Sequence, residues 1–195
     1  MLPLVIAERG VATTARQLFA SHEPALVERA DLRPETPFAG RLFSLLGGST
    51  AGEVVGLVIP GVWRGPAAAA AAATDTTTDA PAPFALVVCD HVNLALRGPL
   101  TGRWPAGVSR SFPCMTGIYQ PAVVRAAGNA PVYSEDVVVA GVGNCEKLTP
   151  FERRALDEAG AVAYADCLVP AVIAAAFYGL KVAACVAPQT AHERE

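Results

Sequence analysis

The chain lacks an excess of positive charge. Its 15 lysines and arginines face 18 aspartates and glutamates, which gives a formal net charge of -3 over 195 residues. Proteins that bind nucleic acid through its phosphates carry a basic patch or stripe, and no such stripe is visible along this sequence. We therefore expect no nucleic-acid partner.

Long apolar runs are also missing. The longest, residues 168–180, has 13 residues and contains Pro170, whereas a helix that spans a bilayer needs about 20 apolar residues. Residues 1–7 are too short for a signal peptide and lack its basic start. These absences predict a soluble, cytoplasmic protein without a membrane partner.

Cysteines are few, and their spacing matches no metal site. The five are odd in number, which argues against a complete set of disulfides. Cys89, Cys167 and Cys185 lie at the ends of apolar runs, where a reduced thiol behaves as a small hydrophobic side chain. The pattern indicates an intracellular protein with buried thiols and no metal.

Apolar side chains, by contrast, are abundant. They make up 52% of the residues, and a chain of this length can bury them in one core, so we expect a single domain over residues 1–195. An alanine run at 67–73 is followed by a polar tract with two prolines. Residues 66–83 are therefore predicted to form an exposed, flexible segment.

The most regular stretch is residues 135–187, where continuous apolar runs alternate with helical patterns. Such alternation predicts a parallel sheet covered on both faces. Ligands of these sheets lie beyond the carboxyl ends of the strands, which here are residues 141–148, Asp166 with Cys167, and residues 188–190. The expected strands are 137–140, 161–167 and 181–186, and the expected helices are 149–159 and 171–178.

The start of the first of these helices is specified by its residues. Thr149 can cap, Pro150 suits the first helical position, and Glu152 can complete a capping box. Gly160 and Gly179 are placed to end the two helices.

The N-terminal half is less regular. We expect a hairpin of strands 41–46 and 53–59 around a glycine-rich turn. Further predicted elements are strands at 2–7 and 84–89 and helices at 11–20 and 119–127.

Several segments, in this order, resemble the trimeric purine nucleoside phosphorylase family. They are Asp90-His91-Val92-Asn93-Leu94, Gly98-Pro99-Leu100, Phe112-Pro113-Cys114-Met115 with Tyr119, Ala140-Gly141, Thr149-Pro150-Phe151-Glu152, Gly160-Ala161, Val169-Pro170 and Gly179-Leu180. The resemblance covers residues 84–190, with a weaker similarity over 1–65.

The resemblance implies an α/β fold with a mixed, largely parallel central sheet flanked by helices, assembled as a homotrimer. It also implies cleavage of the N-glycosidic bond of a purine nucleoside, with inorganic phosphate as co-substrate and no other cofactor. Such chemistry requires an anion site, groups that support the ribose in the transition state, and a donor for the departing purine.

The expected phosphate site is altered. Where the family has a glycine- and serine-rich loop after its first strand, this chain has Glu8-Arg9-Gly10. Glu8 would repel an anion, and Arg9 either compensates or is solvated. In the next loop the family's histidine is missing, and Arg64 is the remaining cation that could meet an anion.

The expected base and ribose sites are altered as well. The family's purine-binding glutamate falls at Leu148, so Glu146 either replaces it or is a solvated loop residue. Asp166 and Cys167 replace a methionine–serine pair. Asp166 could bind ribose hydroxyls or activate a water; the alternative is that it caps a helix.

Two residues of the Phe112–Met115 segment complete the expected substrate site. Phe112 matches the phenylalanine that family members insert into a neighbour's ribose site, and Met115 is also expected to contact substrate. His91 is expected to be structural or interfacial.

Two functions follow from these substitutions. The first is phosphorolysis or hydrolysis of a nucleoside or related N-glycoside, with Asp166 and Glu146 as candidate catalytic residues and Arg64 as an anion contact. The second is a catalytically inactive paralogue that serves as a ligand-binding, regulatory or structural subunit.

Overall fold

The structure, a computed structural model, describes residues 2–32, 40–63, 85–94, 98–101, 112–127, 130–145 and 147–188. Its strands are β1 (Val5–Glu8), β2 (Ala25–Val27), β3 (Val54–Trp63), β4 (Ala85–Asn93), β5 (Val132–Gly141), β6 (Ala161–Ala165) and β7 (Lys181–Pro188). Its helices are η1 (Arg9–Val11), α1 (Ala12–Leu18), α2 (Arg29–Leu32), α3 (Gly40–Leu46), α5 (Pro121–Ala127), α6 (Pro150–Glu158) and α7 (Leu168–Phe177).

The strands form one mixed sheet in the order β2-β1-β3-β6-β5-β4-β7, and β3 also pairs with β7. Five pairings are parallel, whereas β3–β6 and β4–β7 are antiparallel. Because β3 pairs with both β6 and β7, the strands β3, β6, β5, β4 and β7 close into a ring. The expected α/β fold with a mixed, largely parallel sheet and flanking helices is confirmed.

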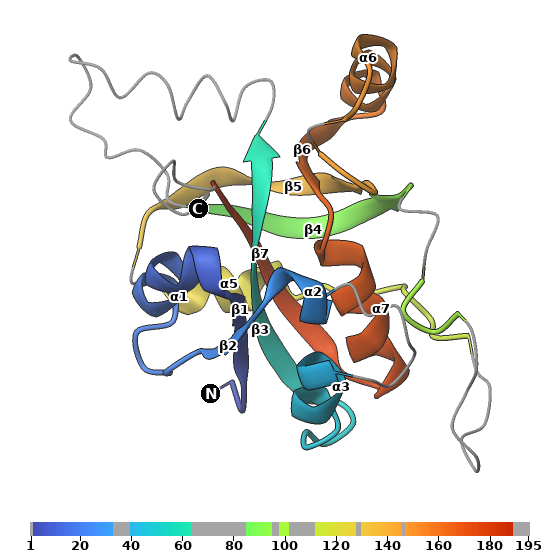
Figure 1. Cartoon of the computed structure of the whole chain (residues 1–195). Coiled ribbons are helices and arrows are strands. Elements are labelled where there is room, and N and C mark those ends of the chain that lie inside the picture. The colour runs from blue at the N-terminus through green and yellow to red at the C-terminus, as the bar shows by residue number, and fades with distance from the viewer. Residues whose placement is uncertain are drawn as a thin grey trace.

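Both faces of the long strands are covered. Along β7, Val182, Ala184 and Val186 belong to a core cluster that includes residues of α2, α3 and α7. The alternate residues, Ala183 and Cys185 among them, belong to a second cluster with residues of α1 and α5. Figure 1 shows these two groups of helices on opposite sides of β3 and β7. The strands are continuously apolar because helices cover both faces of the sheet, as the sequence predicted.

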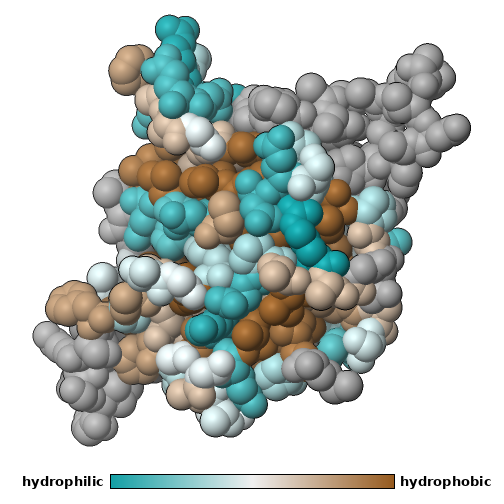
Figure 2. Space-filling view, turned by 180° about the vertical axis from the view of Figure 1, so that it is seen from behind, coloured by the Kyte–Doolittle hydropathy of each residue, from teal (hydrophilic) through white to brown (hydrophobic). Residues whose placement is uncertain are grey.

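Helix α6 stands apart from these layers. It projects from the body in Figure 1 and is largely hydrophilic in the surface view of Figure 2. Only Leu156 of this helix is buried, in a small third cluster with Tyr164 of β6. The predicted capping box is confirmed: the Glu152 backbone N–H donates to Thr149 Oγ1 at 3.2 Å, and the Thr149 N–H donates to Glu152 Oε2 at 2.7 Å.

Two glycines allow the close crossings that bring the strand ends together. A Cβ on Gly61 of β3 would lie 2.8 Å from the carbonyl oxygen of Tyr164 in β6. A Cβ on Gly141, the last residue of β5, would lie 2.2 Å from Cγ2 of Val169 in α7. Real side chains do not approach so closely, so glycine is required at both crossings.

The predicted hairpin is wrong in its first half, because residues 40–46 form helix α3. Leu42, Phe43 and Leu46 are buried while Ser44 is exposed. A strand would place Ser44 on the same face as Leu42 and Leu46, whereas a helix gathers the three apolar residues and leaves Ser44 outside.

Other predicted elements differ at their ends or were not foreseen. Helix α7 begins at Leu168 rather than at residue 171, because Pro170 lies in the first turn, where its missing N–H breaks no helical hydrogen bond. Strand β2 and helix α2 fall in a stretch for which the sequence predicted nothing. The helices predicted to end at Gly160 and Gly179 do so, with positive φ at both glycines. The predicted flexible segment at 66–83 lies outside the described residues.

None of the helices in the described residues is both long and apolar enough to cross a membrane.

Candidate functional site

Three strand ends bring charged side chains to one region of the sheet. Glu8 is the last residue of β1 and pairs in register with Val27, the last residue of β2. Arg29 follows two positions after β2, and Asp166 follows β6 directly. The side chains of Arg29 and Asp166 meet across 137 positions of sequence, so strand ends far apart in the chain contribute to one site.

Asp166 is nearly buried, with 4% of its surface exposed. The Arg29 guanidinium donates from Nη2 to Oδ2 at 2.6 Å and from Nε to the same oxygen at 3.0 Å, with a longer contact of 3.3 Å to Oδ1. This two-pronged geometry is the strong form of an arginine–carboxylate pair. A buried carboxylate needs such a partner, and Arg29 provides it.

The electrostatics of Arg29 follow from this pairing. Partial burial acts to lower the pKa of Arg29, but the hydrogen bonds and negative charge of Asp166 outweigh it and raise that pKa above its usual value. The thiols of Cys167 and Cys145 act in the same direction. Arg29 is therefore a permanent cation at the strand ends.

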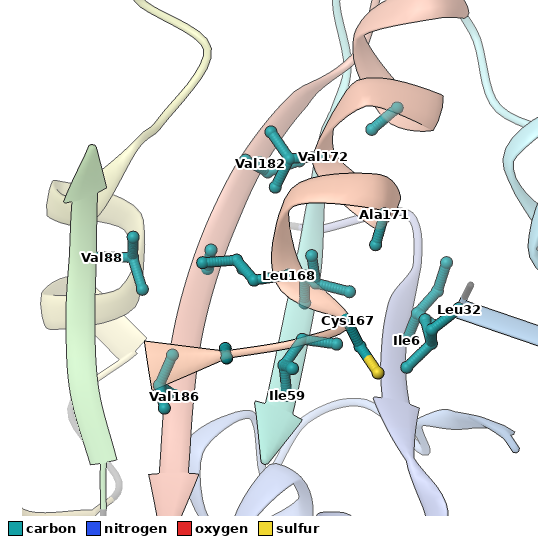
Figure 3. Packing of buried hydrophobic residues seen from close by; sticks show 14 of the residues in the cluster. Ile6, Leu32, Ile59, Val88, Cys167, Leu168, Ala171, Val172, Val182 and Val186 are labelled. Carbon is teal, nitrogen blue, oxygen red and sulfur yellow. The ribbon is translucent and has the colours of Figure 1, made fainter. Parts of the chain in front are cut away.

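Cys167 lies directly behind the carboxylate. It is fully buried, and its Sγ donates to Asp166 Oδ1 at 3.1 Å. Figure 3 shows the sulfur at the start of α7, pointing toward Ile6 of β1 and Leu32 of α2. Asp166 does not occupy the N-cap position of the following helix, which is Cys167, and the Cys167 side chain makes no cap hydrogen bond.

The turn after β1 is closed by its own carboxylate. Oε2 of Glu8 accepts the Gly10 N–H at 2.7 Å, and only 9% of the Glu8 surface is exposed. Next to it, Arg9 forms an ion pair with Glu28 at 2.5 Å. Both side chains of this pair are more than half exposed. Arg9 is thus paired with a carboxylate, although most of its side chain stays exposed to solvent.

The remaining sequence-predicted residues lie elsewhere or are not described. Phe112 is fully exposed, and Met115 is half-buried against the main core cluster. Within the described residues, no hydrogen bond or ion pair joins either of them to Asp166. Arg64 and Glu146 lie outside the described residues, so of the predicted set the structure brings together only Asp166 and Cys167.

His91 has a structural partner. Its Nδ1 lies 2.8 Å from the hydroxyl oxygen of Tyr119, and the two rings meet edge to face. Burial lowers the pKa of His91, although the charge of Asp90 opposes this shift. Burial also raises the pKa of Tyr119, so both rings are neutral near pH 7, as a structural pair requires.

Sequence reasoning missed Arg29. The three-residue strand before it, Ala25–Val27, is too short to give a periodic signal. Around Arg29 the sequence predicted no helix or strand, and the neighbouring residues do not indicate which side chain it pairs with. Only the parallel pairing of β2 with β1, and the position of β6 on the far side of β3, bring Arg29 to Asp166.

No protein-family profile matches this chain, and no curated protein matches it. Among solved structures, it is similar to a purine nucleoside phosphorylase from Schistosoma mansoni complexed with a monocyclic inhibitor, at 17% identity and a TM-score of 0.48, over 70% of this chain and 50% of that one. It is also similar to isoform 2 of the Schistosoma mansoni enzyme in complex with cytosine and ribose-1-phosphate, at 18% identity and a TM-score of 0.48, over 69% of this chain and 46% of that one. The chain thus spans about half the length of these two structures, and a match at this level assigns no role to any residue.

Proposed function

We propose that this chain binds a purine nucleoside, or a related N-glycoside, in a purine-nucleoside-phosphorylase-like site at the carboxyl ends of β1, β2 and β6. The observation that carries the proposal is the placement of Asp166. It follows β6 where the resembled family has its ribose- and phosphate-binding pair, and Arg29 holds it in one orientation. Carboxylates accept hydrogen bonds from sugar hydroxyls, so an oriented, mostly buried carboxylate suits a ribose.

The contact that a ribose hydroxyl would replace is the one from Cys167. A thiol is a weak donor, and its bond to Asp166 Oδ1 is longer than the shortest bond from Arg29. Exchange of the thiol for a hydroxyl would leave the ion pair intact. Arg64 and Glu146 complete the proposal as contacts to an anion and to the base.

Cleavage of the N-glycosidic bond, by phosphorolysis or hydrolysis, is the catalytic form of this function. Asp166 would support the developing charge on the ribose or take a proton from an attacking water, since a general base must lie within hydrogen-bond reach of the proton it removes. Inorganic phosphate is the co-substrate in the first case only.

A second candidate is an inactive paralogue that binds a ligand without turnover or serves as a regulatory or structural subunit. Internal pairing of the acidic groups favours it. Asp166 is engaged by Arg29 and Cys167, and Glu8 by the Gly10 amide. Carboxylates that already accept hydrogen bonds within the chain are better suited to binding and folding than to proton transfer.

The fully exposed ring of Phe112 supports assembly into a homo-oligomer. The resemblance assigns this residue to a neighbour's ribose site, and a side chain with that role has to be exposed in a single protomer. We include a homotrimer and a cytoplasmic location in the proposal.

Hypoxanthine release from inosine, with and without phosphate, together with the melting temperature in the presence of inosine, tests the proposal. We expect inosine to raise the melting temperature and Asp166→Asn to abolish the rise. The matched control is Asp136→Asn, which removes the carboxylate of another arginine pair, with Arg125, in the middle of β5. It should keep the rise. Stabilisation without turnover would select the ligand-binding inactive paralogue. No stabilisation of the unaltered chain by any purine nucleoside, and no turnover, would refute nucleoside binding and leave only the regulatory or structural subunit.

A further inference from the structure

The guanidinium of Arg29 uses only part of its hydrogen-bonding capacity. Its Nε and Nη2 face Asp166, with contacts of 3.0 and 2.6 Å to Oδ2. A guanidinium carries five N–H donors in a planar fork, and Nη1 makes no hydrogen bond among the described residues. The side of the guanidinium formed by Nη1 and the second N–H of Nη2 is called the open edge below.

We propose that the open edge of Arg29 binds an anionic group of the ligand, so that the site takes a nucleoside monophosphate in preference to the uncharged nucleoside. This inference rests on the proposed function and names the class of ligand for the same site.

The exposed member of this ion pair is the cation. Solvent reaches 38% of the Arg29 side chain but only 4% of that of Asp166, so a ligand has more access to the guanidinium than to the carboxylate. Because Asp166 holds Nε and Nη2, the planar group is fixed in one orientation. An arginine that is already oriented loses less side-chain entropy when it binds a further acceptor.

The carboxylates nearest to Arg29 along the chain have other partners. Glu28 accepts a hydrogen bond from Nε of Arg9 at 2.5 Å. Asp31 accepts the backbone N–H groups of Glu28 and Arg41, at 3.1 and 3.4 Å. Since neither carboxylate is hydrogen-bonded to Arg29, the open edge is available to an acceptor from a ligand.

A second arginine pair lacks such an edge. Arg125 also binds a carboxylate, that of Asp136, through Nε and Nη2. Its Nη1, however, donates to the carbonyl oxygen of Tyr133 at 3.2 Å. All three nitrogens of that guanidinium are thus engaged within the chain. The two pairs differ in the feature that we propose to bind the ligand, which makes Arg125 a suitable control.

The charge of the pair favours a phosphate ester over free phosphate. Arg29 and Asp166 carry no net formal charge together, so a free anion gains little from long-range attraction. A phosphate attached to the ribose is brought to the open edge by the other contacts of the nucleoside, which raise its effective concentration. Because hydrogen bonds to charged groups are the stronger ones, we expect inosine monophosphate to bind about tenfold more tightly than inosine.

Two substitutions alter the open edge. Arg29→Lys keeps a positive charge beside Asp166 but replaces the planar fork by a single ammonium. Arg29→Gln removes the charge and keeps an amide that can donate to the carboxylate. The matched controls are Arg125→Lys and Arg125→Gln, which change the pair that has no open edge.

Calorimetry of each protein with inosine, with inosine monophosphate and with inorganic phosphate tests the inference. The readout is the ratio of the two dissociation constants, inosine over inosine monophosphate, which a general loss of stability does not change. We expect about tenfold for the unaltered chain and both Arg125 variants, a smaller ratio for Arg29→Lys, and a ratio near one for Arg29→Gln. If circular dichroism shows that the Arg29 variants do not fold, the unaltered chain decides: its ratio should fall with added salt, which screens the phosphate.

Three results would overturn the inference alone. They are equal binding of inosine and inosine monophosphate by the unaltered chain, an undiminished preference in Arg29→Gln, and binding of inorganic phosphate as tight as that of inosine monophosphate. Absence of binding by both inosine and inosine monophosphate would instead refute the proposed function, and the inference with it.

Discussion

Arg29 and Asp166 form the one two-pronged ion pair that joins helix α2 to the end of β6 in the described structure. They are 137 positions apart in sequence, and the shortest of their contacts is 2.6 Å. Asp166 is almost fully buried, while the Arg29 side chain is 38% exposed. The pair therefore serves two purposes: it anchors a short helix, and it holds a buried carboxylate in one orientation.

Loss of Arg29 should destabilise the fold. Removing one partner of a buried pair costs about 3–5 kcal/mol, because the other charge remains buried without compensation. Since Arg29 is partly exposed, we expect about 2–3 kcal/mol for Arg29→Ala, measured by urea unfolding. The loss should shrink when Asp166→Asn is present, because the two residues are coupled.

Arg16→Ala is the matched control for that measurement. Arg16 also pairs with a glutamate, Glu23, through Nε and Nη2, but the pair is exposed. Exposed pairs contribute little, so no measurable loss is expected. Equal losses for Arg29→Ala and Arg16→Ala would show that burial of Asp166 does not set the strength of its pair.

Asp166 was predictable and Arg29 was not, for a physical reason. Asp166 ends an apolar run in a stretch of alternating strands and helices, and the carboxyl ends of parallel strands are where ligands bind. Arg29 owes its position to the pairing of β2 with β1, which depends on contacts distant in sequence. Local periodicity carries no information about such contacts.

Helix α6 shows the opposite case, in which local chemistry determines the structure. Thr149→Ala should destabilise the protein by about 1 kcal/mol, because it removes the side-chain cap of the Glu152 N–H. Hydrogen exchange of the amides of α6 should accelerate more than exchange in β7. Thr13→Ala is the control, since Thr13 is exposed within α1 and caps nothing. Unchanged exchange in α6 would mean that the packing of Leu156 alone holds the helix.

The failed hairpin has a cause of its own. Residues 41–46 carry apolar side chains at positions compatible with a strand or with a helix, and the glycines after them suit either. The choice is made by packing: Leu42, Phe43 and Leu46 enter the main cluster together with residues of α7. Short apolar runs are ambiguous for this reason.

His91 should make the protein sensitive to acid. Burial lowers the pKa of His91, so the unfolded chain, with an ordinary pKa of about 6.5, binds a proton more readily than the folded one. The contribution of neutral His91 to stability is therefore complete above the unfolded-state pKa. It is lost as the pH falls below that value and through the lower pKa of the folded state. We expect the slope of stability against pH below 6.5 to be smaller in His91→Gln.

Ring titration followed by NMR provides the direct measurement for His91. The resonance should titrate below the value of an unstructured histidine peptide. Tyr119→Phe, which removes the hydroxyl 2.8 Å from Nδ1, tests whether the hydrogen bond holds the ring in its half-buried position. A titration of His91 at or above the peptide value would contradict the prediction.

The five cysteines should differ widely in reactivity. Hydrogen bonds to the backbone and side chain of Thr116 lower the pKa of the exposed Cys114. Burial raises the pKa of Cys185, which is fully enclosed in β7. Because the thiolate is the reactive form, a disulfide reagent such as DTNB should modify Cys114 in a fast phase and Cys185 only on unfolding.

Cys114→Ser should abolish the fast phase, and Thr116→Ala should slow it. A fast phase that persists in Cys114→Ser and also in the double variant with Cys89→Ser, which removes the partly exposed thiol of Cys89, would contradict the burial of Cys145, Cys167 and Cys185.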